Sequence, residues 1–163
     1  CQIQGCQSGY FNVDGACSGG CECLASVVSQ SCNTPASLGT LGVGAAPVTT
    51  SANLVPTGVE AWYTVNFTGN TNPSYHPRVR FTTNPGNAFK FDIRSNCAGG
   101  TLTCGEGGVS NGVTDWETFN GAGSPGYYDA IPPVGNNGTI LIHVYRAAGQ
   151  PLSCSQYTLQ ISN

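Results

Sequence analysis

Four segments of the chain alternate apolar and polar residues with a period of two, the pattern of a strand that buries one face. They span residues 61–68, 88–95, 138–146 and 155–162. Shorter strands are predicted at residues 48–55, 78–83, 112–119 and 127–131, separated by Asn-Pro, Pro-Gly and Gly-Gly pairs. No segment shows convincing helical periodicity. The sequence therefore predicts an all-β fold, an antiparallel sandwich or jelly roll of about seven to nine strands.

The alternation also predicts which side chains enter the core. On the four long segments the inward positions are Tyr63, Val65 and Phe67; Phe89, Phe91 and Ile93; Ile140, Ile142 and Val144; and Tyr157, Leu159 and Ile161. The opposite face of residues 88–95 carries Lys90, Asp92 and Arg94. We expect this row of alternating charge to face solvent.

The nine cysteines divide the chain into two parts. Five of them fall within residues 1–31, namely Cys1, Cys6, Cys17, Cys21 and Cys23. This segment has few large apolar side chains, so we expect a disulfide-stapled N-terminal arm, residues 1–31, and a sandwich, residues 32–163. Because the cytosol keeps thiols reduced, the cysteine density predicts an extracellular or cell-surface protein. Zinc is the competing interpretation for Cys17, Cys21 and Cys23, but their C-x3-C-x-C spacing is not that of paired zinc knuckles.

Spacing suggests some of the disulfide pairs without determining them. Cys97 and Cys104 bracket a Gly-rich loop, and we expect them to be bonded. Cys32 opens the sandwich and Cys154 opens its last strand, so Cys32–Cys154 is a second candidate pair. The five cysteines of the arm then supply two bonds and a remainder.

The odd number of cysteines leaves at least one free, modified or bonded to another molecule. Cys1 could carry a lipid, as the first residue of a mature bacterial lipoprotein does, and eight cysteines would then remain to pair. The alternatives are that Cys1 is joined to another molecule or lies within a longer Cys-rich stretch.

Charged residues are scarce: five basic and eight acidic, or 8% of the chain, with a net charge of −3. A nucleic-acid binder needs a basic patch, which one Lys and four Arg do not readily make. No apolar run approaches the length of a transmembrane helix. These counts exclude nucleic acid as a partner and predict no transmembrane segment.

No catalytic pattern is present in the sequence. It contains neither G-x-S-x-G nor H-E-x-x-H, and its only histidines are His76, in a Pro-rich loop, and His143, on the outward face of a strand. Asp115 and Glu117 flank Trp116 on one strand face, which suits a solvated acidic surface better than a glycosidase. We expect no catalytic residue and no enzyme activity.

Two weaker patterns concern ligands. The stretch Asn12-Val13-Asp14-Gly15 resembles part of a calcium loop but lacks an earlier acidic ligand, so it predicts a tight turn, with Ca²⁺ as a weak alternative and no cofactor otherwise. Trp116, Tyr127 and Tyr128 lie beside Gly-rich loops and form a candidate platform for polysaccharide.

The sandwich part resembles the bacterial pre-peptidase C-terminal domain family. The resemblance rests on the segment from Leu54 to Phe67, the strand Phe89–Arg94 with Asp92, and the last two long strands. The arm, from Gly9 to Gly15 and then Cys21-Glu-Cys23, is similar to Cys-rich modules of secreted myxobacterial surface proteins. The resemblance implies a secreted, non-catalytic β-sandwich, often appended to a hydrolase. Ala61 follows Glu60 where the family often has a second acidic residue, so the resemblance does not carry a calcium site over to this position.

Two functions remain to be weighed. The first is a non-catalytic extracellular structural protein, a repeating subunit of a surface fibre or matrix that associates with itself or with other surface proteins. A surface of Ser, Thr, Asn and Gly enters repeated contacts at less cost in side-chain entropy and desolvation than a surface of Lys and Glu. The second is a secreted polysaccharide- or matrix-binding accessory module of a larger hydrolase or adhesin.

Overall fold

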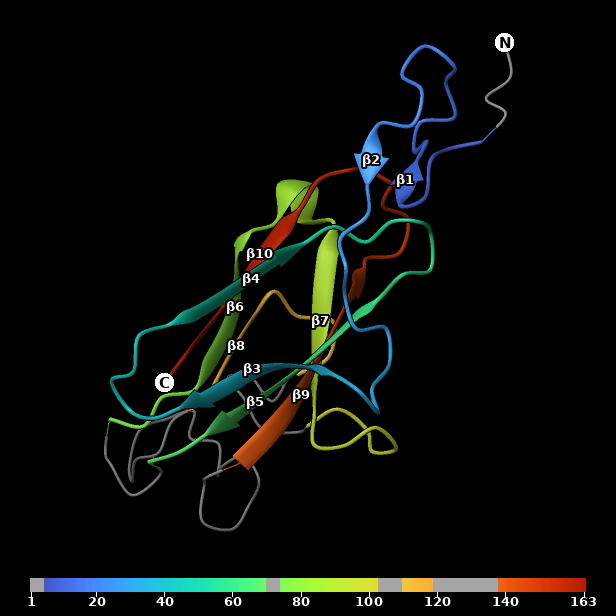
Figure 1. The fold of residues 1–163 in the computed structure, drawn as a ribbon. Helices are drawn as coiled ribbons and strands as arrows, with labels where there is room; N and C mark the ends of the chain where they lie inside the picture. The colour runs from blue at the N-terminus through green and yellow to red at the C-terminus, as the bar shows by residue number, and fades with distance from the viewer. Residues whose placement is uncertain (1–4, 70–73, 103–109, 119–137) are drawn as a thin grey trace.

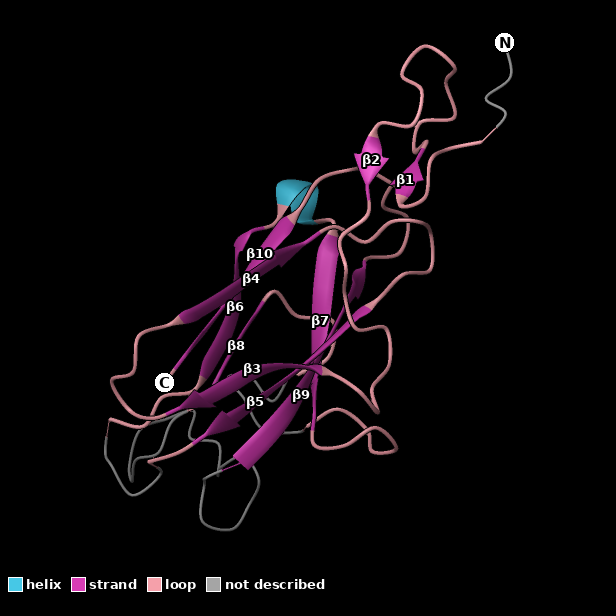
Figure 2. Ribbon diagram, in the orientation of Figure 1, coloured by secondary structure: helices cyan, strands magenta, loops and turns pink. Residues whose placement is uncertain are grey.

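The computed structural model describes residues 5–69, 74–102, 110–118 and 138–163. Within these residues, two four-stranded sheets form a sandwich, and a separate two-stranded sheet lies in the N-terminal arm. Figures 1 and 2 show this small sheet projecting beyond one end of the sandwich. The predicted all-β sandwich with a disulfide-linked N-terminal region is confirmed. The predicted strand at residues 127–131 lies outside the described residues.

The first sheet is antiparallel throughout. In spatial order it contains β4 (Val48–Ala52), β10 (Tyr157–Ser162), β6 (Arg78–Thr83) and β8 (Asp115–Glu117). The second sheet contains β3 (Ala36–Leu41), β5 (Ala61–Phe67), β9 (Gly138–Arg146) and β7 (Phe89–Arg94). A short 3-10 turn, Pro85–Asn87, connects β6 to β7.

The second sheet is mixed, and its one parallel strand pair among the described residues departs from the predicted antiparallel arrangement. β3 and β5 run parallel because the chain reverses twice between them, passing through β4 in the other sheet. β3 itself was not predicted. Its register shifts between Ser37 and Thr40, where Gly39 adopts a φ of 86°, and this irregularity breaks the alternation that marks a strand in the sequence.

The core lies between the two sheets. All twelve predicted inward side chains are buried there, with at most 4% of any of them exposed. The Tyr63 and Tyr157 hydroxyls are 2.7 Å apart and join the two sheets across the core. Burial, with a smaller contribution from Tyr63, raises the pKa of Tyr157 strongly, and either hydroxyl can be the donor of this hydrogen bond.

One side of the sandwich is closed by residues that cover the outer edge of β7. Phe91 exchanges two main-chain hydrogen bonds of 3.0 Å with Val113, and Ile93 N–H donates to Ser110 at 2.8 Å. Val113 lies two residues before β8, so β8 and β7 occupy the same side of the sandwich. β4 and β3, the other edge strands of the two sheets, therefore lie on the opposite side.

The arm is fixed to the sandwich by covalent and hydrogen bonds. Its strands β1 (Tyr10–Phe11) and β2 (Cys23–Leu24) pair with each other, and a Cys6–Cys21 disulfide joins the segment before β1 to the segment before β2. A Cys23–Cys154 disulfide then joins β2 to the segment before β10. The buried Asn53 side chain bonds the main chain of Ser26 at 2.8 Å and of Leu24 at 2.9 Å.

Both predicted disulfide pairs of the sandwich are wrong. Cys97 is bonded to Cys32 and not to Cys104, and Cys154 is bonded to Cys23 and not to Cys32. The main chain after β2 runs beside the start of β5, where Ser29 accepts a 2.8 Å hydrogen bond from Trp62 N–H, and this path brings Cys32 to the end of β7.

Three cysteines remain. Cys17 is the one free cysteine within the described ranges, and it is half-buried. Cys1 and Cys104 lie outside those ranges, so their predicted states stay predictions.

Candidate functional site

A cluster of polar side chains covers the outer face of β5, β7 and β9. The pleat that sends Phe91 and Ile93 into the core places Asp92 on this face, but Asp92 is 5% exposed and not solvated as predicted. Its Oδ1 accepts hydrogen bonds from the Tyr145 hydroxyl at 3.0 Å and from Gly112 N–H at 2.9 Å. Arg94 Nη2 lies 3.3 Å from Oδ2. Residues beside β7 therefore bury a carboxylate that the sequence pattern assigns to solvent.

His143 lies between two carboxylates in this cluster. Its imidazole stacks on Trp62 with ring centroids 4.1 Å apart, and its Nε2 lies 2.7 Å from Glu60 Oε2. Its Nδ1 is 3.7 Å from Asp92 Oδ2, too long for a hydrogen bond. No serine, threonine or cysteine of the described residues hydrogen-bonds His143, so no nucleophile is paired with this potential base. His143 lies on the outward face of its strand, as predicted, but its side chain is only 12% exposed.

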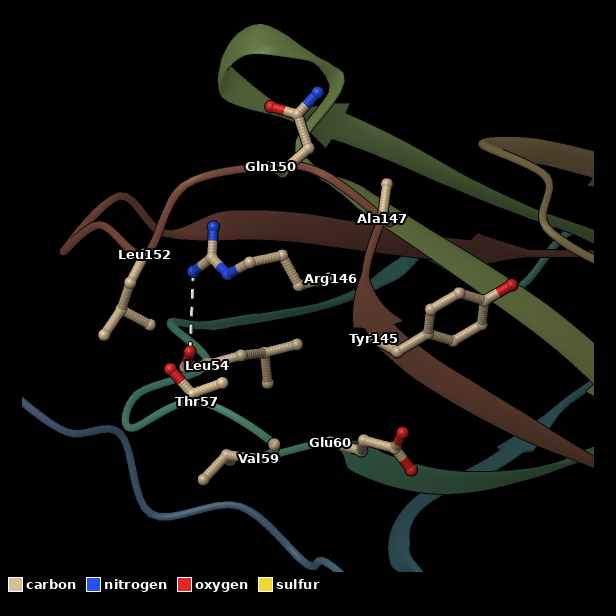
Figure 3. Close-up of a pocket in the computed structure, with 10 residues that line it drawn as sticks. Leu54, Thr57, Val59, Glu60, Tyr145, Arg146, Ala147, Gln150 and Leu152 are labelled. Carbon is tan, nitrogen blue, oxygen red and sulfur yellow. Dashed lines mark hydrogen bonds between the residues drawn. The ribbon is translucent and has the colours of Figure 1, made fainter.

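A pocket of about 270 Å³ adjoins this cluster (Figure 3). Glu60 and Tyr145 lie at one end of it, and Arg146 crosses it. The Arg146 guanidinium donates to the main-chain carbonyls of Pro151 at 3.0 Å, and of Leu54 and Ser153 at 3.4 Å. Desolvation lowers the pKa of Arg146. Its polar atoms thus hold the segment that carries Cys154 in place, which is a structural role.

The outer face of β6 and β8 carries a second polar cluster. Arg78 bonds both Asp115 carboxylate oxygens, at 2.9 and 2.5 Å. Glu117 Oε2 lies 3.0 Å from His76 Nε2 and 3.5 Å from Arg78 Nε. The two carboxylates that flank Trp116 therefore share one strand face, as predicted, but they are engaged in ion pairs with Arg78.

Trp116, the one residue of the predicted aromatic platform within the described ranges, does not fit that role. Trp116 is 2% exposed and belongs to the core, because the pleat that turns Asp115 and Glu117 outward turns Trp116 inward. Its position beside a Gly-rich loop was therefore a poor guide to exposure. Tyr127 and Tyr128, the other two residues of the platform, lie outside the described residues.

The Asn12–Gly15 stretch forms a tight turn whose side-chain oxygens bind main-chain amides. Asn12 Oδ1 accepts from Gly15 N–H at 2.8 Å, and Asp14 Oδ1 accepts from Ala16 N–H at 2.7 Å. Glu22 Oε1 accepts from Val13 N–H at 2.9 Å, and this bond is the main cause of the lowered pKa of Glu22. Within the described ranges, no three His, Cys, Asp or Glu side chains are grouped closely enough to hold a metal ion.

The side of the sandwich opposite β8 and β7 is formed by two uncharged edge strands. β3 pairs only with β5, and β4 pairs only with β10, among the strands that the structure describes. We call these two strands the open edge. No charged residue occurs between Glu22 and Glu60, so neither strand carries the Lys that commonly blocks such an edge. This uncharged run was the sequence signal that could have located the surface.

The described part of the chain contains no helix long and apolar enough to cross a membrane. No family model, curated protein or solved structure matches the chain, and its resemblance to the pre-peptidase C-terminal family stays a prediction.

Proposed function

We propose that this chain is a non-catalytic extracellular structural protein whose copies associate through the open edge formed by β3 and β4. The observation that carries the proposal is the contrast between the two sides of the sandwich. Residues 110–113 cover β7 beside β8, whereas β3 and β4 each keep one unpaired side within the described residues. A strand edge with free N–H and C=O groups is a template for pairing with another chain.

The composition of the open edge favours an uncharged protein partner. Ser37 on β3 and Thr49 on β4 are exposed, and neither strand has an ionisable side chain. Short hydroxylated side chains lose little rotamer entropy when they are covered, and no charge has to be desolvated. A second copy of the chain presents the same kind of surface.

The disulfides support the proposed location. Three are formed among the described cysteines, and two of them connect segments more than 60 residues apart. Bonds of this kind persist in oxidising surroundings such as the cell exterior. A structural protein placed there gains resistance to unfolding and proteolysis from such cross-links.

The test is the state of association of the oxidised protein. The wild-type chain, purified without reductant, is expected to form oligomers or filaments by light scattering and negative-stain electron microscopy. The double variant Ser37→Lys/Thr49→Lys is expected to remain monomeric, because each new ammonium would have to be desolvated at the contact. The control is Thr82→Lys/Thr139→Lys, which adds the same charge at exposed positions on inner strands of the two sheets.

A wild-type chain that stays monomeric at high concentration would overturn the proposal. A monomer that is retained on a polysaccharide column would instead favour the accessory binding module. Trp116 is buried, so it cannot serve that alternative as an exposed aromatic contact.

A further inference from the structure

The large apolar side chains that the described part of the chain leaves exposed all belong to the N-terminal arm. They are Tyr10, Leu24 and Val27, with exposed fractions of 39%, 58% and 104%. Tyr10 and Leu24 are cross-strand partners in the β1–β2 sheet, and Val27 follows three residues after Leu24. We call these three residues the arm patch. Tyr10 and Leu24 lie side by side, and Val27 is the most exposed apolar side chain of the same arm. Adjacent exposed apolar side chains mark a contact surface more often than isolated ones do.

The main chain at the arm patch is also available for pairing. Within the described residues, no hydrogen bond involves the N–H or C=O of Val27. Its neighbours are fixed: Ala25 N–H donates to Gly9 at 2.8 Å, and Ser26 is bonded to Asn53 in both directions. Val27 is therefore presented on a segment that is ordered before any partner binds, which lowers the entropy cost of a contact.

The charges of the arm argue against an anionic partner. Residues 1–59 contain Asp14 and Glu22 but no Lys or Arg, the first basic residue after them being Arg78. Anionic membranes and acidic polymers attract basic segments, so this arm has no electrostatic attraction to either. An uncharged protein surface fits better, and the open edge is such a surface on the same chain.

We infer that the arm patch of one copy docks on the open edge of the next copy; this inference rests on the proposed function. The arm projects beyond one end of the sandwich, whereas β3 and β4 lie along its flank (Figure 1). Two different surfaces then meet, and the contact is heterologous. Contacts of this type repeat from copy to copy and build an open filament, unless the rotation that relates one copy to the next closes a ring.

The test uses two variants with complementary defects. Leu24→Asp/Val27→Asp disables the arm patch and keeps the open edge, and Ser37→Lys/Thr49→Lys does the reverse. Ser18→Asp/Gln30→Asp is the matched control, because it adds the same charge at exposed polar positions of the arm. Circular dichroism of each variant establishes that the sandwich is folded. The mass of each species is measured by size-exclusion chromatography with light scattering.

Each defective variant alone is expected to be a monomer of about 16.8 kDa. Their equimolar mixture is expected to form a heterodimer of twice that mass and to stop there, because one intact arm meets one intact edge. The Ser18→Asp/Gln30→Asp control is expected to assemble like the wild type.

The other outcomes separate the two proposals. If the arm variant still assembles while the edge variant does not, the inference is overturned and the proposed function stands. If the edge variant assembles, both are overturned. A mixture that remains monomeric overturns the arm-to-edge contact. Arm-dependent co-sedimentation with vesicles of phosphatidylcholine and phosphatidylglycerol would assign the arm patch to a membrane and also overturn it.

Discussion

Asp92 accepts a 3.0 Å hydrogen bond from the hydroxyl of Tyr145, across the pairing of β7 with β9 on the outer face of the second sheet. Gly112 N–H and Arg94 complete the contacts of the carboxylate. A buried charge with these partners is stabilised by them, and removing the carboxylate would leave Arg94 and two hydrogen-bond donors without their acceptor.

The first prediction concerns Asp92. Asp92→Ala is expected to lower the free energy of unfolding by about 3 kcal/mol, because a buried ion pair and two hydrogen bonds are broken together. Lys90→Ala is the control on the same strand and is expected to change it by less than about 0.5 kcal/mol. Urea unfolding of both variants measures the difference. Equal stabilities of the two variants would contradict the role given to Asp92.

The second prediction concerns alkaline pH. Burial, followed by the hydrogen bond to Asp92, raises the pKa of Tyr145 to about 12 from its ordinary value of 10.0. Between these values the unfolded chain loses a proton that the folded chain keeps, so the folded state loses stability as pH rises. The stability that Tyr145 contributes through its raised pKa is fully present below pH 10 and is lost as the pH rises toward 12. Tyr145→Phe is expected to flatten the fall in stability across this window, and an unchanged slope in urea titrations would refute the assignment.

The third prediction concerns the disulfide that anchors the arm. Cys23→Ala/Cys154→Ala opens a link between residues 131 apart, whereas Cys6→Ala/Cys21→Ala opens one between residues 15 apart. In the chain-entropy model the expected losses are about 5 and about 3 kcal/mol. Limited proteolysis is expected to cut the arm first in the Cys23/Cys154 variant. A greater loss from the shorter link would argue against this anchoring role.

The fourth prediction concerns Arg146, whose guanidinium bonds three carbonyl groups around the segment that leads to Cys154. Arg146→Ala is expected to cost about 2 kcal/mol and to speed amide hydrogen exchange in residues 147–154. Arg146→Lys keeps the charge but not the planar fork, so its effect is expected to be intermediate. Exchange that speeds equally throughout the sandwich would show that Arg146 has no local role.

The alternation of side chains was sufficient to predict the β-sandwich and its core. Phe89, Phe91 and Ile93 illustrate why: a strand has a side-chain period of two, and burying one face requires every second residue to be apolar. β3 escaped prediction because Gly39 interrupts that period. Trp116 was assigned to the surface from a neighbouring loop, although the pleat shared with Asp115 and Glu117 turns it inward.

The sequence by itself therefore determined the all-β class, the inward faces of the long strands, the density of cysteine and the lack of charge. These properties depend on neighbours within one strand or on composition. Only the tertiary structure decided that Asp92 is buried, that Cys32 meets Cys97, and that β3 and β4 form the uncovered side. Each of these depends on which strand ends and edges become neighbours, and contacts between residues distant in sequence leave no local pattern for periodicity or spacing to reveal.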